Sequence, residues 1–304
     1  MWVCSTEKKV RIAITATPSQ PRDARLLLCG DLADTFRQAA EYGCQGVEIH
    51  MRRAEEVDVE AVKRLAADYH LGVPTLGTGM ARVDGLTFAD ADPEVRARTV
   101  ERVQGHIAFA AEVGSAVTIG ILSGKLGDCK AEERRSRRAR AIECLAHVCR
   151  LAARSGVTVW LEPLNRYECD YIKTLGDGMN VVAEIGAPNL KLLADTFHMN
   201  IEEVDLLASL KAAGSSIGHV HLADTNGQAP GHGHLDVAGI LGALSEIGYQ
   251  GYLAFEVFPL PDACTAIRDA ITAVYAAALG VPQEGNASDG AARLRARPEK
   301  SHRQ

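Results

Sequence analysis

Residues 155–163 read SGVTVWLEP, and this stretch decides the fold because it joins the end of a helix to a buried strand. Gly156 follows a long amphipathic segment, and glycine is the residue that most often ends a helix in the left-handed conformation. The apolar run that begins at Val157 is short and rich in β-branched residues, as is typical of strands. The same succession of amphipathic segment, stop and short apolar run recurs along the chain.

This alternation predicts eight strands and eight helices. The expected strands cover residues 10–16, 46–50, 74–78, 116–122, 157–163, 190–196, 217–222 and 252–257. The expected helices cover residues 31–42, 58–70, 93–113, 131–155, 174–185, 204–213, 237–247 and 262–279. Strands that each precede a helix favour a parallel sheet, and eight such units favour an α/β fold of the (β/α)₈ TIM-barrel type. An open doubly wound sheet would need a Gly-rich turn after its first strand, where this chain has TATP (15–18).

Length and composition fit one domain of this kind. The chain has 304 residues, 47% of them hydrophobic, and TIM barrels of about 250 residues form a single domain. We expect an N-terminal extension over residues 1–9, a catalytic barrel over residues 10–282 and a disordered tail over residues 283–304. The tail is polar and rich in Gly, Ala and Arg, so it has few apolar side chains to bury.

Charge and cysteine content exclude several classes of protein. A net charge of −6 argues against a nucleic-acid partner, which would require a basic surface. The eight cysteines form no CxxC pair, so we expect mostly small buried residues of a reducing cytosol. No segment approaches the roughly 20 apolar residues of a membrane span, and no signal peptide is recognisable. The sequence therefore predicts a soluble cytoplasmic protein.

Polar residues stand at the ends of the last four expected strands, the positions where barrels carry their chemistry. These residues are Glu162, Asp195, His221 and Glu256. Three carboxylates and an imidazole brought together without a cation would repel one another and lose hydration. Their oxygen and nitrogen atoms suit Mn²⁺, with Co²⁺ and Mg²⁺ as alternatives. We therefore predict that the four residues bind one divalent metal ion.

The other histidines receive different interpretations. His50, His70 and His106 are expected to be structural or surface residues. His232 and His234 lie in APGHGHLD (229–236), where we expect a loop that closes over the pocket or faces solvent rather than additional ligands.

The motifs around the predicted ligands resemble those of a known enzyme family. The relevant segments are LEPLNRYE (161–168), LADTFHMNIEE (193–203), HVHLADTN (219–226), APGHGHLD (229–236) and FEVFPLP (255–261). They are similar to motifs of the sugar phosphate isomerase/epimerase family of xylose-isomerase-like barrels. Within this family the chain resembles D-tagatose/D-allulose 3-epimerases and, most closely, 5-keto-L-gluconate epimerases. The resemblance extends over residues 10–280.

The resemblance implies a reaction and the residues that carry it. The four strand-end residues match the metal ligands, and Glu162 and Glu256 also match catalytic carboxylates on opposite faces of the substrate carbon. Glu168 and His198 match residues that hold the substrate's oxygens. The implied activity is epimerisation of a keto sugar or keto sugar acid by removal and return of a proton through an enediolate. It needs no organic cofactor, and the implied assembly is a homodimer or homotetramer.

Gly227 departs from the family pattern. The family commonly has an arginine at this position, which contacts substrate oxygens. We expect either that Arg166 or Lys125 supplies the cation from another loop, or that the glycine leaves room for a larger substrate.

Other functions remain open at this point. An aldose–ketose isomerase of the hydroxypyruvate isomerase type, or an enolate-forming lyase or dehydratase acting on a keto sugar or inosose, would use the same carboxylates and metal. An apurinic endonuclease would need histidines after the third and fourth strands, where LGTGMA (76–81) and IGILSG (119–124) have none. A binding module without catalysis would not require all four ligands to be intact.

Overall fold

The strands form a closed parallel barrel, which confirms the predicted fold. The computed structural model describes residues 10–19 and 24–280, and its one sheet has the order β2-β1-β3-β4-β5-β6-β7-β8-β9. β9 also pairs with β1 in parallel, with Phe255 opposite Ile14, and this pairing closes the ring. The strands are β1 (Arg11–Thr17), β2 (Leu28–Cys29), β3 (Gly46–His50), β4 (Thr75–Gly77), β5 (Ala116–Ile119), β6 (Val159–Leu161), β7 (Leu190–Asp195), β8 (Ile217–His221) and β9 (Tyr252–Phe255).

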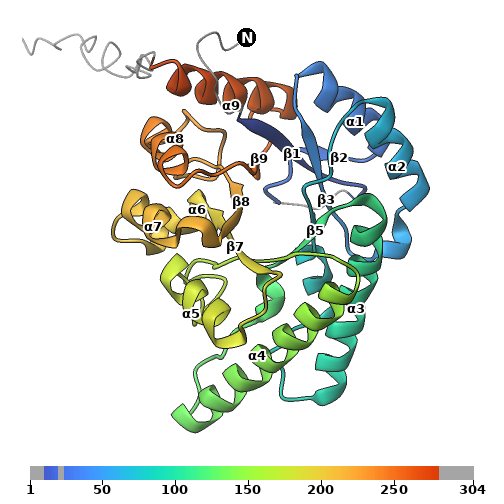
Figure 1. Cartoon of the computed structure of the whole chain (residues 1–304), viewed down its shortest axis with the longest axis vertical. Coiled ribbons are helices and arrows are strands. Elements are labelled where there is room, and N and C mark those ends of the chain that lie inside the picture. The colour runs from blue at the N-terminus through green and yellow to red at the C-terminus, as the bar shows by residue number, and fades with distance from the viewer. Residues whose placement is uncertain (1–9, 20–23, 281–304) are drawn as a thin grey trace, which may run out of the picture.

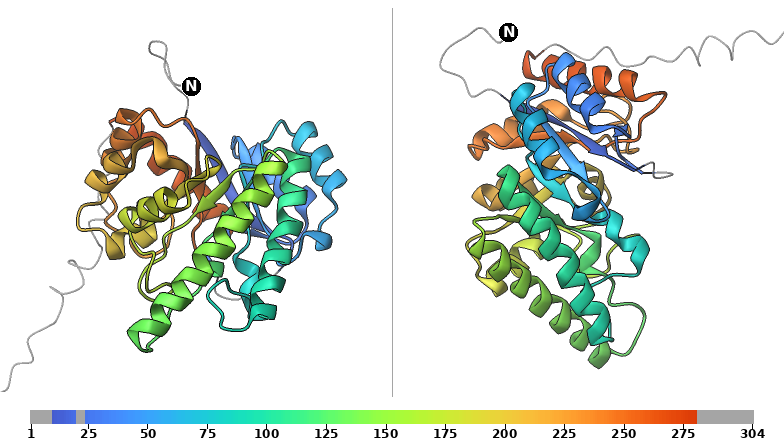
Figure 2. Two further views of the ribbon diagram at one scale, coloured as in Figure 1. Left: turned by 60° about the horizontal axis from the view of Figure 1, so that its bottom comes forward. Right: turned by 90° about the vertical axis from the view of Figure 1, so that its right-hand side faces the viewer.

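Helices surround the strands as an outer ring (Figure 1). They are α1 (Leu32–Glu41), α2 (Val59–Asp68), α3 (Pro93–Val113), α4 (Ala131–Arg154), α5 (Leu175–Ile185), α6 (Thr196–Glu202), α7 (Leu206–Ala213), α8 (Val237–Glu246) and α9 (Ala263–Ala278). Short 3₁₀ turns are η1 (Ala54–Glu56), η2 (Gly79–Asp84), η3 (Ile121–Ser123) and η4 (Gly214–Ser216). The two longest helices, α3 and α4, run side by side and reach beyond the rest of the ring (Figure 2).

Local sequence signals explain most helix boundaries. Asp92 accepts the N–H of Glu94, Pro93 occupies the first position of α3, and Gly114 ends this helix with φ +68°. Other helices begin after aspartates whose side chains accept first-turn N–H groups, such as Asp31 before α1. A cap of this kind stabilises a helix by about 1 kcal/mol. The helices therefore start and stop close to where the sequence predicts.

Three differences from the predicted elements have physical reasons. β5 ends at Ile119, because residues Ile121–Ser123 turn into η3. α7 begins at Leu206 rather than residue 204, because Asp205 caps it by accepting the N–H of Ala208. β2 and α6 were not expected: β2 is only two residues long, and α6 follows β7 without an intervening loop. The expected N-terminal extension (1–9) and tail (283–304) lie outside the described residues.

The cysteines confirm the prediction only in part. Those among the described residues are free thiols, with Cys44, Cys149 and Cys169 buried but Cys29 and Cys264 exposed. Burial raises the pKa of Cys44 and of Cys149 to about 12, so these two thiols are unreactive at neutral pH. Among residues 10–19 and 24–280, no helix has the length and apolar character needed to cross a membrane.

Candidate active site

The four predicted metal ligands lie together at the carboxyl ends of β6 to β9. Glu162, Asp195, His221 and Glu256 each offer one ligand atom, and these atoms all lie within 4.8 Å of one another. His221 Nδ1 is 3.5 Å from Glu162 Oε1 and 3.5 Å from Glu256 Oε2. The sequence predicted a cluster at this end of the barrel, and the structure places all four residues in it.

Backbone hydrogen bonds position two of these residues, Asp195 and Glu162. Asp195 is both the last residue of β7 and the N-cap of α6, and its Oδ1 accepts the N–H of Phe197 at 2.8 Å. Its other oxygen, Oδ2, accepts from Arg25 Nη1 at 3.0 Å. The N–H of Glu162 donates to the carbonyl of Ile119 at 2.9 Å. A Cβ at Gly120 would lie 2.5 Å from Glu162 Oε2, so any side chain there would displace this carboxylate.

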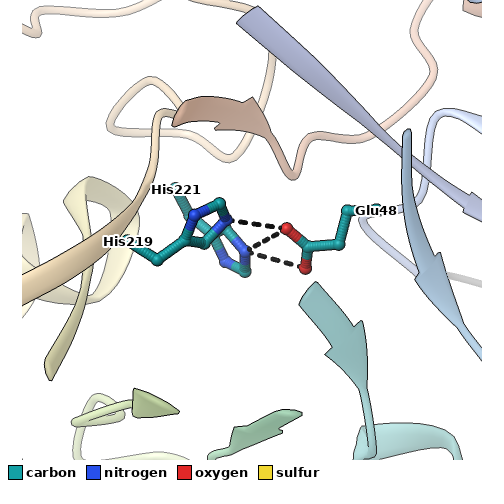
Figure 3. A group of neighbouring side chains, drawn as sticks. All are labelled: Glu48, His219 and His221. Atoms are coloured by element: carbon teal, nitrogen blue, oxygen red, sulfur yellow. Dashed lines mark hydrogen bonds and ion pairs between the residues drawn. The ribbon is translucent and has the colours of Figure 1, made fainter. Parts of the chain in front are cut away.

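A fully buried carboxylate, Glu48 on β3, orients the histidine of the cluster (Figure 3). It accepts from His221 Nε2 at 3.0 and 3.1 Å and from His219 Nε2 at 2.8 Å. A carboxylate acts here as an acceptor, so His221 carries its hydrogen on Nε2 and turns Nδ1 toward Glu162 and Glu256. Carboxylates in this outer position are typical of metal-binding histidines, because they fix the tautomer and the ring orientation.

The residues at this point fit a divalent ion. Among the described residues, His221 Nδ1 is one of few buried side-chain atoms without a hydrogen-bond partner, and such an atom costs about 1–3 kcal/mol. Burial alone would lower the pKa of His221, but Glu48 and Glu256 outweigh it and raise this pKa well above its usual value. The cluster therefore attracts positive charge strongly, as either a proton or a metal ion.

Glu48, His219 and His221 form a second group with metal-ligand side chains. Their contacts of 2.8–3.1 Å are hydrogen-bond lengths, and all three residues are buried at 1% exposure or less. We interpret this triad as the support of the first cluster rather than as a separate ion site, because the imidazole N–H groups already fill the space between the ligand atoms.

The cluster opens into a cavity of about 400 Å³. Both catalytic candidates, Glu162 and Glu256, and both predicted substrate-binding residues, Glu168 and His198, line it. Its walls also include Thr78, Ile121, Leu164, Phe197 and Phe258. A space of this size with a few converging polar groups suits a small molecule.

Glu162 and Glu256 have opposite tendencies to hold a proton. Burial raises the pKa of Glu162 above its usual value. Burial acts on Glu256 in the same direction, but the charges of Arg25 and His221 outweigh it and bring the pKa of Glu256 well below its usual value. Two nearby carboxylates with such different proton affinities are suited to act as a pair of acid and base.

Two residues of the cavity were missed or misjudged from the sequence. Arg25, in the loop after β1, lines the cavity and bonds Asp195 Oδ2 at 3.0 Å. His50, expected to be structural or on the surface, lines the cavity and binds Glu48 at 2.8 Å. The sequence gives little indication of either residue. Arg25 lies in no recognisable motif. His50 is the last residue of β3, and this strand-end position could have marked it as a candidate site residue.

Arg166 and Lys125, the two residues expected to replace the family's arginine, lie outside the cavity. Arg166 pairs with Glu202 at 2.7 Å, and Lys125 donates to the carbonyl of Tyr167 at 2.5 Å. Neither lines the cavity. The expectation that Arg166 or Lys125 supplies this charge is therefore wrong, because local partners hold both side chains away from the site.

The remaining histidines lie outside the cluster. His106, inside α3, contacts the carbonyls of Arg102 and Met51 and has a structural role, as expected. His232 binds Asp269 at 2.9 Å and His234 contacts Thr225 at 3.1 Å. Neither lines the cavity, so both belong to the structure of the 229–236 loop.

Comparison with known proteins gives the family. Residues 36–296 match the family model described as the xylose isomerase-like TIM barrel, and the chain belongs to this family. It is 33% identical over 228 residues to L-ribulose 3-epimerase of Mesorhizobium japonicum, covering 75% of this chain and 76% of that protein. It is 30% identical over 248 residues to 3-dehydro-D-guloside 4-epimerase of Escherichia coli, covering 79% and 93%. A solved L-ribulose 3-epimerase structure matches with a TM-score of 0.76 at 26% identity, over 96% of this chain and 100% of that one.

These comparisons confirm the family that the motifs indicated. Its relatives are named as epimerases of keto sugars and of a keto glycoside, which are isomerases. The strand-end cluster described above lies within the matched residues.

Proposed function

We propose that this protein is a metal-dependent epimerase of keto sugars or keto sugar acids. The observation that carries the proposal is the pair Glu162 and Glu256, which face His221 Nδ1 at equal distances and have pKa values displaced in opposite directions. The names of the relatives support the same class of reaction.

The two carboxylates have the properties that epimerisation requires. Inversion next to a carbonyl needs a base that removes the proton on one face and an acid that returns a proton on the other face. Glu256 is the carboxylate held ionised, and Glu162 is the one that more readily holds a proton. In the reverse reaction the roles exchange. Only 10% of the Glu162 side chain and 14% of the Glu256 side chain are exposed, which limits loss of the proton to water between the two steps.

A divalent ion would be held by Glu162, Asp195, His221 and Glu256. Such an ion would supply Lewis-acid stabilisation of the negative charge that develops on the substrate's oxygens. Because three of the four ligands are carboxylates, we propose Mn²⁺, with Co²⁺ or Mg²⁺ as alternatives. The cytoplasmic location and the homodimeric or homotetrameric assembly remain predictions from the sequence.

His198, one of the two predicted substrate-binding residues, has hydrogen bonds that fix the tautomer of its ring. The backbone N–H of Asn165 donates to His198 Nδ1 at 3.2 Å, and Asn165 Nδ2 lies 2.7 Å from the same atom. Nδ1 is thus an acceptor, so the hydrogen of the neutral ring is on Nε2. His198 is one of the residues that line the cavity. His198 can donate this hydrogen to an oxygen of the sugar.

The test is a panel of substrates incubated in D₂O with Mn²⁺, Co²⁺ or Mg²⁺. The panel contains L-ribulose, D-psicose, D-tagatose, 5-keto-L-gluconate and a 3-keto glycoside, so that both 3- and 4-epimerisation are covered. We expect an epimer carrying deuterium at the inverted carbon, detected by NMR. The exposed Glu132→Gln variant, on the first turn of α4, serves as a control with unchanged rates.

Other products would identify the alternative functions. Deuterium at carbon 1 or 2 with a change of aldose to ketose would show an aldose–ketose isomerase. A product that has lost water or an aglycone would show a dehydratase or lyase. No exchange with any substrate and any of the three ions would contradict the proposed enzyme class.

A further inference from the structure

The guanidinium group of Arg25 lies in the site, where contacts along its edge and on its face hold it. Nη1 bonds Asp195 Oδ2 at 3.0 Å, and Nη2 is 3.1 Å from Glu256 Oε2. The guanidinium carbon lies 4.4 Å from the centre of the Phe197 ring. The side chain is 13% exposed. An arginine fixed in this way presents its donors in a constant direction.

One contact of Arg25 brings two hydrogen-bond donors together. Arg25 Nη2 lies 3.0 Å from His198 Nε2, and the bonds from Asn165 place the hydrogen of the neutral ring on that nitrogen. Two adjacent donors do not satisfy each other, whereas an oxygen atom with two lone pairs satisfies both. Asp195 Oδ2 lies 3.5 Å from His198 Nε2, beyond the usual length of a hydrogen bond. The two groups therefore form a receptor for an oxygen at the wall of the cavity.

We propose that Arg25 is a substrate-binding residue that holds, together with His198, an oxygen next to the reacting carbon of the keto sugar. This inference rests on the proposed function and adds to it the cation that orients the substrate. The neighbouring carboxylates favour a neutral oxygen of the substrate, since a hydroxyl or carbonyl oxygen can accept from Arg25 where another carboxylate would be repelled.

The backbone at Gly227 belongs to the same arrangement. Its φ is +76°, and a Cβ there would lie 2.8 Å from Phe258 Cε2 and 3.4 Å from Arg25 Cδ. The N–H of Phe258 donates to the carbonyl of Gly227 at 2.8 Å, which keeps the two segments together. The space beside Gly227 is thus filled by Phe258 and by the stem of Arg25. The expectation that the glycine leaves room for a larger substrate is wrong for this reason.

The experiment compares Arg25→Met and Arg25→Lys with Arg37→Met in the Mn²⁺-loaded protein. Arg37 is an exposed arginine of α1 that pairs with Glu41, so its variant controls for loss of a charge alone. KM and kcat are measured on the substrate identified by the panel. Binding of a hexitol, which resembles the sugar but has no carbonyl to react, is measured by calorimetry. Mn²⁺ affinity and Tm are measured for every variant.

We expect Arg25→Met to raise KM and the hexitol Kd by about 10- to 100-fold, the range for one hydrogen bond to a charged group. Arg25→Lys should recover part of the loss, and Arg37→Met should stay within twofold of the wild type. Mn²⁺ affinity should be unchanged or higher in Arg25→Met, because a positive charge next to the ligands has been removed. Gly227→Arg should lower kcat/KM by displacing Phe258 and Arg25.

Three results would overturn the inference. They are hexitol binding and KM unchanged in Arg25→Met, a loss of Mn²⁺ affinity that accounts for the loss of activity, or a higher kcat/KM in Gly227→Arg. A wild-type protein that turns over no substrate contradicts the proposed function instead, and hexitol binding then still measures the effect of Arg25 by itself.

Discussion

Substitution of Glu48 by glutamine tests whether the buried hydrogen bonds behind the cluster govern metal binding. Glu48 lines no part of the cavity, and it accepts from His50, His219 and His221 at 2.8–3.1 Å. Burial alone would raise the pKa of Glu48, but the three histidines bring it well below the usual value. Glutamine keeps the shape and removes the charge.

The amide can accept hydrogen bonds through only one of its two terminal atoms. Its NH₂ group then faces imidazole N–H groups that it cannot satisfy, and one histidine must change tautomer. If His221 does so, its hydrogen moves to Nδ1, the atom that faces Glu162 and Glu256. A protonated Nδ1 cannot bind a cation. Loss of an outer partner of this kind lowers metal affinity by about 10- to 100-fold, which corresponds to about 1.4–2.7 kcal/mol.

The assay is calorimetric or EPR titration of Glu48→Gln with Mn²⁺, together with thermal unfolding in EDTA. We expect a Kd that is 10- to 100-fold higher and a protein destabilised by about 1–3 kcal/mol through the unsatisfied buried donor. The control is Glu60→Gln on α2, where the side chain is 60% exposed. A Kd for Mn²⁺ within twofold of the wild type would refute the assigned tautomer of His221 and the role of Glu48.

Three further outcomes follow from the site and the salt bridges. Treatment with EDTA should abolish turnover and Mn²⁺ or Co²⁺ should restore it; full activity of a protein shown to be metal-free would contradict the predicted ligands. Glu162→Gln and Glu256→Gln should each lower kcat by at least about 10²-fold, because each removes a proton-transfer group, and a residual rate above one tenth would exclude that role. Arg52 and Arg102 hold the pKa of Asp84 below its usual value, so Asp84 stabilises the fold above the unfolded-state pKa of about 4, and this contribution is lost as the pH falls further. The difference in unfolding free energy between wild type and Asp84→Asn, from urea titrations, should therefore be larger at pH 7 than at pH 3.

The sequence predicts an element well where residues that start and stop helices mark its ends. α3 has the predicted bounds because Asp92-Pro93 begins it and Gly114 ends it. α6 has no start signal separate from the strand before it, because a single residue, Asp195, both ends β7 and caps α6. A sequence prediction that gives each segment one type of structure therefore either extends β7 into the residues of α6 or places a loop there. β2 has two residues and no pattern of its own, so only the closed barrel brings it beside β1.

The sequence predicts the residues of the site that lie on neighbouring strands, but not those that meet across the barrel. Glu162, Asp195, His221 and Glu256 end four successive barrel strands, so chain order alone places them side by side. Glu48 comes from β3, separated from β8 by β1 and β9, and its contacts with His219 and His221 cross the interior of the barrel. A strand pattern gives the direction of a side chain but not its partner across the barrel.

The charges of the site favour a proton on one of its carboxylates. Glu48, Glu162, Asp195 and Glu256 bring four negative charges into a largely buried space, where Arg25 contacts Asp195 and Glu256. A divalent ion leaves one charge uncompensated, and repulsion between buried carboxylates is relieved when one of them binds a proton. Glu162, whose pKa is raised, is the carboxylate where this proton is most stable. In the proposed reaction one exchangeable proton passes between the acid and the base, and this balance of charges would supply it.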